Sequence, residues 1–227
     1  MKKGYLSNLE TWSIDKDDKK IPILLNSSKR DHRCFINLFN KYIDKSSDFK
    51  EEIFEIGCSP GRFLIYFANN FYYRPSGVEM DKDRCELTRE NLLSQNIEAQ
   101  IIEKDVFKID LKKKFKLVIS CGFIEHFEGK KLEELLKIHS DLTKKDGLIF
   151  LSFPNFRYLN FLLAYIFRKE VLDLHNLKIM NKDFFKYFAE KYGFKILYLD
   201  YFGSIHPGGL KFKNNSRFSF INYILNV

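Results

Sequence analysis

The strongest chemical signal in the sequence is a glycine-containing loop after a short apolar strand. The segment E-I-G-C-S-P-G begins at Glu55. Gly57 and Gly61 have no side chains, so a ligand can approach the backbone closely, and the helix that follows presents free N–H groups. The G-x-x-x-G spacing differs from the G-x-G-x-x-G of a dinucleotide site, and Glu55 favours a ligand with a cationic amino acid end. We predict that Glu55, Gly57, Cys58, Ser59 and Gly61 bind this ligand, although an ordinary tight turn is the alternative.

Two further acidic residues stand at the ends of the next two expected strands. Glu79 and Met80 end the second strand, and Asp105 and Val106 follow the third. A carboxylate such as Glu79 can accept both hydroxyls of a ribose. Asp105 could accept a hydrogen bond from an adenine amino group, with Val106 donating its backbone N–H. Each acid alone could be a solvated loop residue, but their recurrence after three successive strands indicates one binding site.

Apolar strands alternate with helical patterns along most of the chain. Alternation of this kind predicts a parallel sheet with helices on both faces, which binds ligands at the carboxyl ends of its strands. We expect Asp31 to cap the first helix. The expected strands are 53–56, 77–80, 99–103, 117–120, 148–153 and 194–201, with a further one at 218–224, and the expected helices are 31–45, 61–70, 82–95, 130–143 and 182–192.

In this order the motifs resemble those of the class I S-adenosylmethionine (SAM)-dependent methyltransferases, especially the small-molecule group that includes ubiquinone and sugar methyltransferases. The matching segments are E-I-G-C-S-P-G, G-V-E-M-D, K-D-V, L-V-I-S-C-G-F-I-E-H-F and L-I-F-L-S-F-P-N, within residues 50–155. The resemblance implies an α/β, Rossmann-like SAM-methyltransferase fold with a mostly parallel seven-stranded sheet and helices on both faces. It also implies SAM as the cofactor and S-adenosylhomocysteine as the product. Two departures are the stiffer pair Ser59-Pro60, where the family often has a further glycine, and Lys116, where an acid often begins the fourth strand.

The segment after the fourth strand resembles the family's segment beside the methionine part of SAM, which adds Ser120 and Cys121 to the expected cofactor contacts. Methyl transfer to a hydroxyl requires an aligned acceptor and removal of a proton. His126 could be the general base, because the pKa of histidine lies near neutrality. The alternative is that Glu125 and His126 only orient the loop, and His175 is a second candidate base. His139 is expected on an exposed helix face without a role, and no metal site is expected.

Residues 154–181 interrupt the strand and helix alternation and are expected to form a lid over the acceptor. The segment leaves the fifth strand at its carboxyl end, where the ligand site should lie. Arg157 and Arg168 could hold a phosphate or carboxylate of the acceptor. A capping helix with solvated basic ends, or a membrane-docking helix, are the alternatives. The expected acceptor contacts are Asn155, Arg157, Tyr158, Arg168 and Asn176.

Length and composition fit one domain. The 227 residues are divided into an N-terminal extension, 1–30, and a methyltransferase domain, 31–227. The formal net charge of +8 and the pI of about 9.1 favour anionic ligands, although the lysines stand beside acids and could form a solvated surface. The four cysteines lack metal-ligand spacing. Without a signal peptide or a spanning segment, we expect a cytoplasmic monomer or homodimer with no transmembrane segment.

Three functions remain open. The first is methylation of an O or N atom of a small anionic metabolite, phosphorylated or linked to a sugar or nucleotide, for example in synthesis of a cell-surface polysaccharide. The second is RNA methylation, which the pI allows. It is disfavoured because S-C-G-F replaces the N-P-P-Y type tetrapeptide and no RNA-binding module is recognisable, so no stable nucleic acid partner is expected. The third is a non-catalytic scaffold with this fold.

Overall fold

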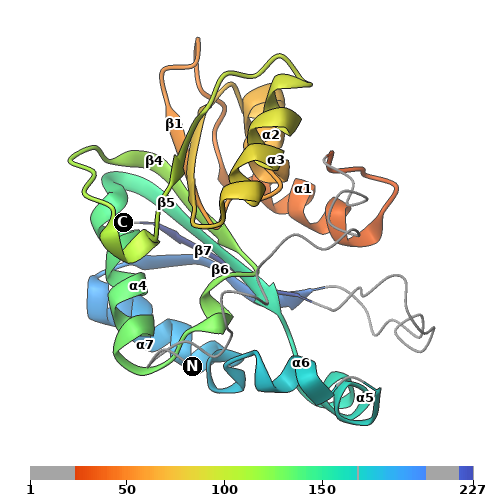
Figure 1. Ribbon diagram of the computed structural model, residues 1–227. Helices are drawn as coiled ribbons and strands as arrows, with labels where there is room; N and C mark the ends of the chain where they lie inside the picture. Colours follow the sequence, from red (N-terminus) through yellow and green to blue (C-terminus); the bar gives the residue numbers. More distant parts are fainter. Residues whose placement is uncertain (1–23, 168, 203–219, 227) are drawn as a thin grey trace.

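The computed structural model describes residues 24–167, 169–202 and 220–226 (Figure 1). The strands are β1 (Glu52–Ile56), β2 (Arg74–Glu79), β3 (Gln100–Glu103), β4 (Phe115–Cys121), β5 (Thr143–Pro154), β6 (Lys195–Phe202) and β7 (Phe220–Asn226). The α-helices are α1 (Arg30–Tyr42), α2 (Arg62–Phe71), α3 (Lys82–Leu93), α4 (Gly129–Leu142), α5 (Leu159–Phe167), α6 (Lys169–Asp173) and α7 (Lys182–Tyr192). Short 3₁₀ helices are η3 (Val106–Lys108), η4 (Ile124–His126) and η5 (Leu177–Ile179).

The strands of the described segments form one seven-stranded sheet in the order β3-β2-β1-β4-β5-β7-β6. Neighbours from β3 to β5 are parallel, whereas β7 runs antiparallel to β5 and β6. The prediction of a Rossmann-like, mostly parallel seven-stranded sheet is therefore confirmed. The strand order reverses between β1 and β4, and ligands of such sheets bind outside the carboxyl ends of the strands at this switch point.

Each face of the sheet carries its own apolar core. Successive strand residues point to opposite faces. Ile53 of β1 therefore packs in the cluster that contains Phe39 of α1 and Phe67 of α2, and the adjacent Phe54 packs in the cluster that contains Leu135 of α4. Figure 1 shows α1, α2 and α3 on one side of the sheet and α4 and α7 on the other. Both faces are covered, which explains why the central strands are nearly continuous apolar runs.

Element boundaries differ from the sequence-based ranges at a few places. Helix α7 occupies the predicted range. The prediction that Asp31 caps the first helix is wrong, because α1 begins at Arg30 with Lys29 in the cap position and no side-chain cap. Strand β5 begins at Thr143 rather than at residue 148, since Thr143 pairs with Phe115 at the start of β4 before the register shifts. Residues 1–23 of the expected N-terminal extension lie outside the described part of the chain.

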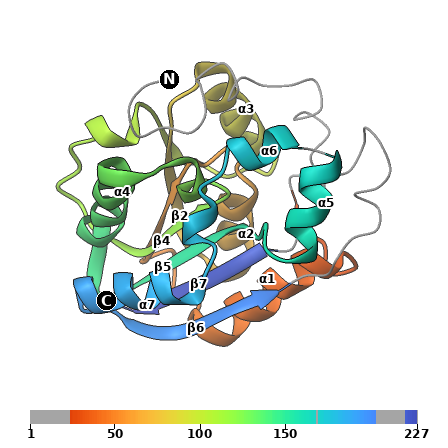
Figure 2. The same ribbon diagram turned by 90° about the horizontal axis from the view of Figure 1, so that it is seen from below.

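The segment predicted as a lid forms α5, α6 and η5. These elements lie beyond the carboxyl end of β5, in front of the sheet when the molecule is viewed from below (Figure 2). The expected position of the insertion, beside the ligand-binding edge, therefore agrees with its location. Within the described ranges, no helix is long and apolar enough to cross a membrane.

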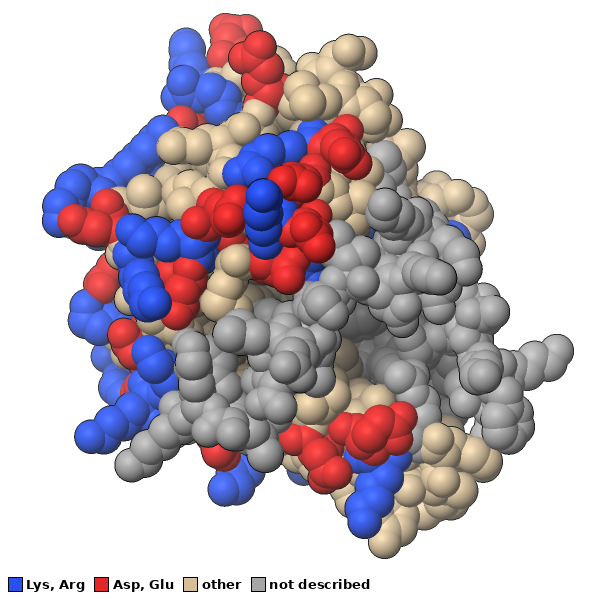
Figure 3. Space-filling model, viewed as in Figure 1, with Lys and Arg blue, Asp and Glu red and all other residues tan. Residues whose placement is uncertain are grey.

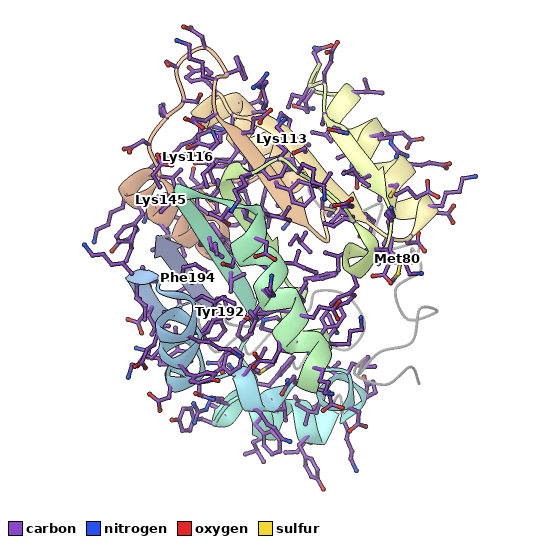
Figure 4. All side chains as sticks on the ribbon, turned by 90° about the vertical axis from the view of Figure 1, so that its left-hand side faces the viewer. Met80, Lys113, Lys116, Lys145, Tyr192 and Phe194 are labelled. Carbon is purple, nitrogen blue, oxygen red and sulfur yellow. The ribbon has the colours of Figure 1, made fainter. Side chains whose placement is uncertain are left out.

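Lysines near the start of β4 and of β5 lie far from the carboxyl ends of the parallel strands. Figure 4 shows Lys113, Lys116 and Lys145 together at one end of the sheet and Met80 toward the other. Lys113 forms an ion pair with Glu52 at 2.7 Å, and the visible face of the molecule mixes basic and acidic side chains (Figure 3). Lys116 thus lies at the end of the sheet away from Met80, one of the predicted cofactor residues (Figure 4).

Candidate functional site

The loop between β1 and α2 lies at the carboxyl edge of the sheet and needs its glycines. Gly57 has φ +73° and Gly61 has φ +90°, which is the left-handed region that glycine adopts most readily. A Cβ atom on Gly57 would lie only 2.4 Å from Cδ2 of Phe123. The Cys58 side chain is buried against β2, since a Cβ atom added to Gly77 would lie only 2.7 Å from the Cβ atom of Cys58. Cys58 can therefore contact a ligand only through its backbone.

A cavity at this edge joins the predicted cofactor residues of three strand ends. Glu79 Oε1 accepts hydrogen bonds from the backbone N–H groups of Met80 (2.7 Å) and Asp81 (3.0 Å). Asp105 Oδ1 accepts one from Phe107 N (3.1 Å). Burial raises the pKa of Glu79, and the two backbone hydrogen bonds oppose this shift. The cavity is lined by Gly57, Val78, Glu79, Met80, Lys104, Asp105, Val106, Phe107, Phe123 and Phe127.

Buried polar atoms without a hydrogen-bond partner gather around the same edge. Among the described residues they are Glu55 Oε2 and Ser59 Oγ at the end of β1, Glu125 Oε2 after β4, and Ser152 Oγ and Asn155 Oδ1 at the end of β5. Native proteins leave few such atoms, and each one costs about 1–3 kcal/mol. Their concentration at one edge indicates that a polar ligand completes them.

Glu55 gives the site a buried carboxyl group. It is 3% exposed, and burial raises its pKa well above 4.5, while the positive charge of nearby Arg62 opposes the shift. A cationic group placed beside Glu55 would stabilise the ionised form. Burial, followed by the charges of Glu55 and Glu125, raises the pKa of Cys121 well above 9.0. Cys121 is therefore a neutral thiol and not an activated nucleophile.

The end of β4 is tied to α4 by a buried hydrogen-bond network. His139 is fully buried, which contradicts the expectation of an exposed helix face. Its Nε2 lies 3.1 Å from Ser120 Oγ, and its Nδ1 lies 2.8 Å from the carbonyl oxygen of Leu135. The Ser120 side chain is thus turned towards α4, and only its backbone is available to a cofactor. Burial lowers the pKa of His139 to about 4, so it is neutral at physiological pH.

Both candidate bases are brought together, although they are far apart in the sequence. The ring centroids of His126 and His175 are 4.8 Å apart. The buried Glu125, to which the sequence analysis gave at most an orienting role, lies beside them, with Oε1 3.9 Å from His126 Nε2. Burial, and then the charge of His175, lower the pKa of His126 to about 4. A group with so low a pKa takes a proton from a hydroxyl poorly at neutral pH, which weakens the case for His126 as a simple general base.

The lid residues divide into those facing the protein and those facing outward. Asn155 is buried and leaves Oδ1 without a partner. Arg157 Nη1 donates to Met180 O and to the Tyr201 hydroxyl, each at 3.3 Å. Tyr158 is 81% exposed.

Both polar atoms of the Asn176 side chain are hydrogen-bonded within the protein. Its Nδ2 donates to Phe127 O at 2.8 Å and its Oδ1 accepts from Lys178 N. This geometry favours a positioning role over acceptor contact. Arg168 lies outside the described residues.

Residues 53–147 match the family described as a methyltransferase domain. The match runs from β1 through α4 to the start of β5 and includes each acidic residue that lines the cavity. Residues 53–147 therefore form a methyltransferase domain. SAM is the cofactor of this family.

Solved structures share the fold of the methyltransferase. A protein from Pyrococcus horikoshii OT3 is 18% identical with a TM-score of 0.64, over 94% of this chain and 99% of that one. A SAM-dependent methyltransferase from Archaeoglobus fulgidus is 18% identical with a TM-score of 0.61, over 86% and 94%. Magnesium protoporphyrin IX methyltransferase from Synechocystis PCC 6803, solved with S-adenosylhomocysteine, is 12% identical with a TM-score of 0.59, over 97% and 87%. The comparison with curated proteins found no match.

The residues of this methyltransferase fit SAM chemically. The unpartnered Glu55 Oε2 suits an ammonium group. Glu79 has one oxygen held by backbone N–H groups, which fixes the carboxylate for hydroxyl donors such as those of a ribose. Gly57 leaves no room for a side chain where the cavity meets Phe123. A fixed acid and a bare backbone thus line one cavity, and a buried acid lies two residues before Gly57 in β1.

Proposed function

We propose that this protein transfers the methyl group of SAM to an oxygen or nitrogen atom of a small acceptor held between η4 and the lid. The observation that carries the proposal is the set of unpartnered buried polar atoms at the carboxyl ends of β1, β4 and β5. Those at β1 lie with the cofactor residues, while Glu125 and Asn155 lie towards the lid. One edge of the sheet thus offers polar groups for two ligands side by side.

The cofactor site would be formed by the three acidic strand ends and the glycine loop. Glu55 would hold the ammonium group, Glu79 the ribose hydroxyls, and Asp105 with the Val106 backbone the adenine. The loop from Gly57 to Gly61 would contribute backbone groups. When bound, SAM would supply a methyl group carried on a positively charged sulfur, and transfer of this group to an acceptor lone pair would break the C–S bond and leave S-adenosylhomocysteine.

The lid would hold and align the acceptor. Asn155 Oδ1 accepts hydrogen bonds and has no partner among the described residues, so it suits a hydroxyl or amino group of the acceptor. The Arg157 guanidinium uses Nη1 for its two contacts with the protein, and its other donors favour an anionic acceptor. A phosphorylated or nucleotide-linked sugar has both kinds of group, and we propose this class, which would include precursors of a cell-surface polysaccharide.

Chemistry at the acceptor also requires that its proton leave. Three titratable side chains lie together where η4 meets the lid. Glu125 and His126 come from η4, and His175 comes from the turn after α6. We assign proton removal to this group. Alignment by the lid lowers the barrier independently of proton removal, because it replaces a bimolecular encounter by a fixed geometry.

The experiment that tests the cofactor site is calorimetric titration with SAM and, separately, with S-adenosylhomocysteine. We expect micromolar binding of both ligands to the unaltered protein, and at least about tenfold weaker binding of SAM to Glu55→Gln, about 1.4 kcal/mol. Glu98→Gln, on an exposed residue before β3, is the matched control and should bind normally.

Failure of the folded protein to bind either ligand would refute the proposal and support a non-catalytic scaffold. Once binding is established, transfer of labelled methyl groups to phosphorylated and nucleotide-linked sugars tests the acceptor class. Labelling of RNA instead would overturn the assignment of a small acceptor.

A further inference from the structure

Three metal-binding side chains converge beside the lid. Glu125 and His126 belong to η4, and His175 follows α6. Each offers one ligand atom, and these atoms all lie within 4.8 Å of one another. Glu125 Oε1 and His126 Nε2 are 3.9 Å apart. Two imidazoles and one carboxylate are a common ligand set for divalent first-row transition metals.

Both imidazoles are oriented as metal ligands usually are. His126 Nδ1 lies 3.0 Å from the carbonyl oxygen of Leu174, and His175 Nδ1 lies 2.6 Å from that of Val171. A carbonyl oxygen only accepts, so each Nδ1 carries the hydrogen. In a neutral ring the lone pair then belongs to Nε2. Hydrogen bonding of one ring nitrogen to a backbone carbonyl is the arrangement that fixes the tautomer of metal-bound histidines.

One oxygen of the carboxylate in the cluster has no hydrogen-bond partner among the described residues. Glu125 is 1% exposed, and its Oε2 is buried without a hydrogen bond. A buried carboxylate needs a counter-charge or donors. A divalent cation between Glu125 and the two imidazoles would supply that charge.

We propose that Glu125, His126 and His175 bind one divalent first-row transition metal ion. Metal–ligand bonds of about 2.0–2.2 Å require ligand atoms closer together than they are here, so side-chain rotation must close the cluster. The backbone is held in place while this happens. Asn176 N donates to Glu125 O at 2.6 Å, so the segments that carry the ligands are already joined.

Three protein ligands leave coordination positions open. Structural metal sites are usually closed by four protein ligands, whereas open positions are typical of sites that bind substrate or water. If the proposed methyl transfer is correct, the three side chains would promote proton removal through the ion. The ion would bind the acceptor oxygen and lower the pKa of its hydroxyl, and the proton would pass to water. This step rests on the proposed function, but metal binding itself does not.

The test is titration of the metal-free protein with Co²⁺, followed by visible absorption and by competition with Zn²⁺. We expect one Co²⁺ per chain, d–d bands, and no sulfur-to-cobalt charge-transfer band, because the ligands are nitrogen and oxygen. Glu125→Gln and His175→Gln should each weaken Co²⁺ binding by more than about tenfold. His139→Gln, a buried histidine outside the cluster, is the control and should retain it.

The circular dichroism spectrum of each variant and its affinity for SAM, by calorimetry, are measured as well. Together they establish that a variant that loses metal is still folded. Stoichiometric Co²⁺ binding that survives in both Glu125→Gln and His175→Gln would overturn the proposal, as would absence of binding to the unaltered protein at about 100 μM Co²⁺. If the protein binds SAM but does not bind Co²⁺, only the metal site is refuted. If it binds Co²⁺ but does not bind SAM, only the proposed function is refuted.

Discussion

Replacement of Gly57 by alanine is expected to displace the Phe123 ring and weaken SAM binding. Gly57 has φ +73°, and a Cβ in this region costs about 1–2 kcal/mol. The new Cβ would lie 2.4 Å from Phe123 Cδ2, whereas ordinary contacts begin at 3.4 Å. The ring must therefore retreat by the difference, about 1 Å, and overpacking of this kind costs a further ~1–3 kcal/mol. Phe123 lines the cofactor cavity, so its displacement changes the shape of the site.

Gly193 provides the matched control. Its φ is +70°, and a Cβ built there meets no atom within 4 Å, so Gly193→Ala carries the same backbone strain without a collision. In urea denaturation we expect Gly193→Ala to lose about 1–2 kcal/mol of unfolding free energy. Gly57→Ala should lose about 2–5 kcal/mol, the sum of strain and overpacking. Calorimetry should give unchanged SAM affinity for Gly193→Ala and at least about tenfold weaker binding for Gly57→Ala.

A double-mutant cycle with Phe123→Ala separates the collision from other effects. Removal of the ring abolishes the contact at 2.4 Å, so the Gly57→Ala/Phe123→Ala protein should be more stable than the sum of the two single losses predicts. A coupling free energy of about 1 kcal/mol or more is expected for residues in contact. Zero coupling, or equal SAM affinities for Gly57→Ala and Gly193→Ala, would refute the steric explanation.

Three other variants test separate parts of the structure. Glu79→Gln keeps an oxygen for the Met80 N–H group but removes the charge, so calorimetry should show about 1.5–3 kcal/mol weaker SAM binding; unchanged affinity would contradict the ribose assignment. Burial lowers the pKa of His139 from 6.5 to about 4, so the unfolded chain binds more protons between these values and stability falls as pH falls through this range. Urea denaturation at pH 7 and pH 5 should therefore show about 2 kcal/mol less acid destabilisation for His139→Gln than for the unaltered protein, and equal losses would be evidence against a buried neutral ring. Lys113→Ala removes a surface ion pair with Glu52 and should change the free energy of unfolding by less than about 1 kcal/mol, with no effect on SAM affinity. A clear loss of SAM affinity would contradict the proposed site, which lies at the other end of the sheet.

That the proposed cofactor residues lie at one edge of the sheet could be predicted from the sequence, because their positions follow from the strands that carry them. Each of Glu55, Glu79 and Asp105 closes an apolar strand, and parallel strands bring such ends to one edge whatever the loops do. The glycine at position 57 indicates that another group packs closely against the backbone there. The sequence does not show that this group is Phe123, which follows the end of β4. Pairing of this kind depends on tertiary packing and leaves no periodic signal.

His139 was misplaced although the sequence contains a signal for it. Leu132, Leu135, Leu136, His139 and Leu142 are spaced as one face of a helix, and that face is buried in α4. Polarity alone favours an exposed position for His139, because histidine is polar and Lys137 and Asp141, two residues away on either side, are charged. The partner of His139, the Ser120 hydroxyl on β4, could not be inferred, because the pairing depends on how α4 packs on the sheet.

The convergence of His126 and His175 could not be predicted, because it depends on how the lid folds back over η4. The returning segment is joined to η4 by backbone and side-chain hydrogen bonds, from Asn176 N to Glu125 O, from Asn176 Nδ2 to Phe127 O and from His126 Nδ1 to Leu174 O. Phe127 also lines the cofactor cavity. The lid is thus bonded to η4 and to Phe127, while the cavity is lined by Phe123 and Phe127 on either side of η4.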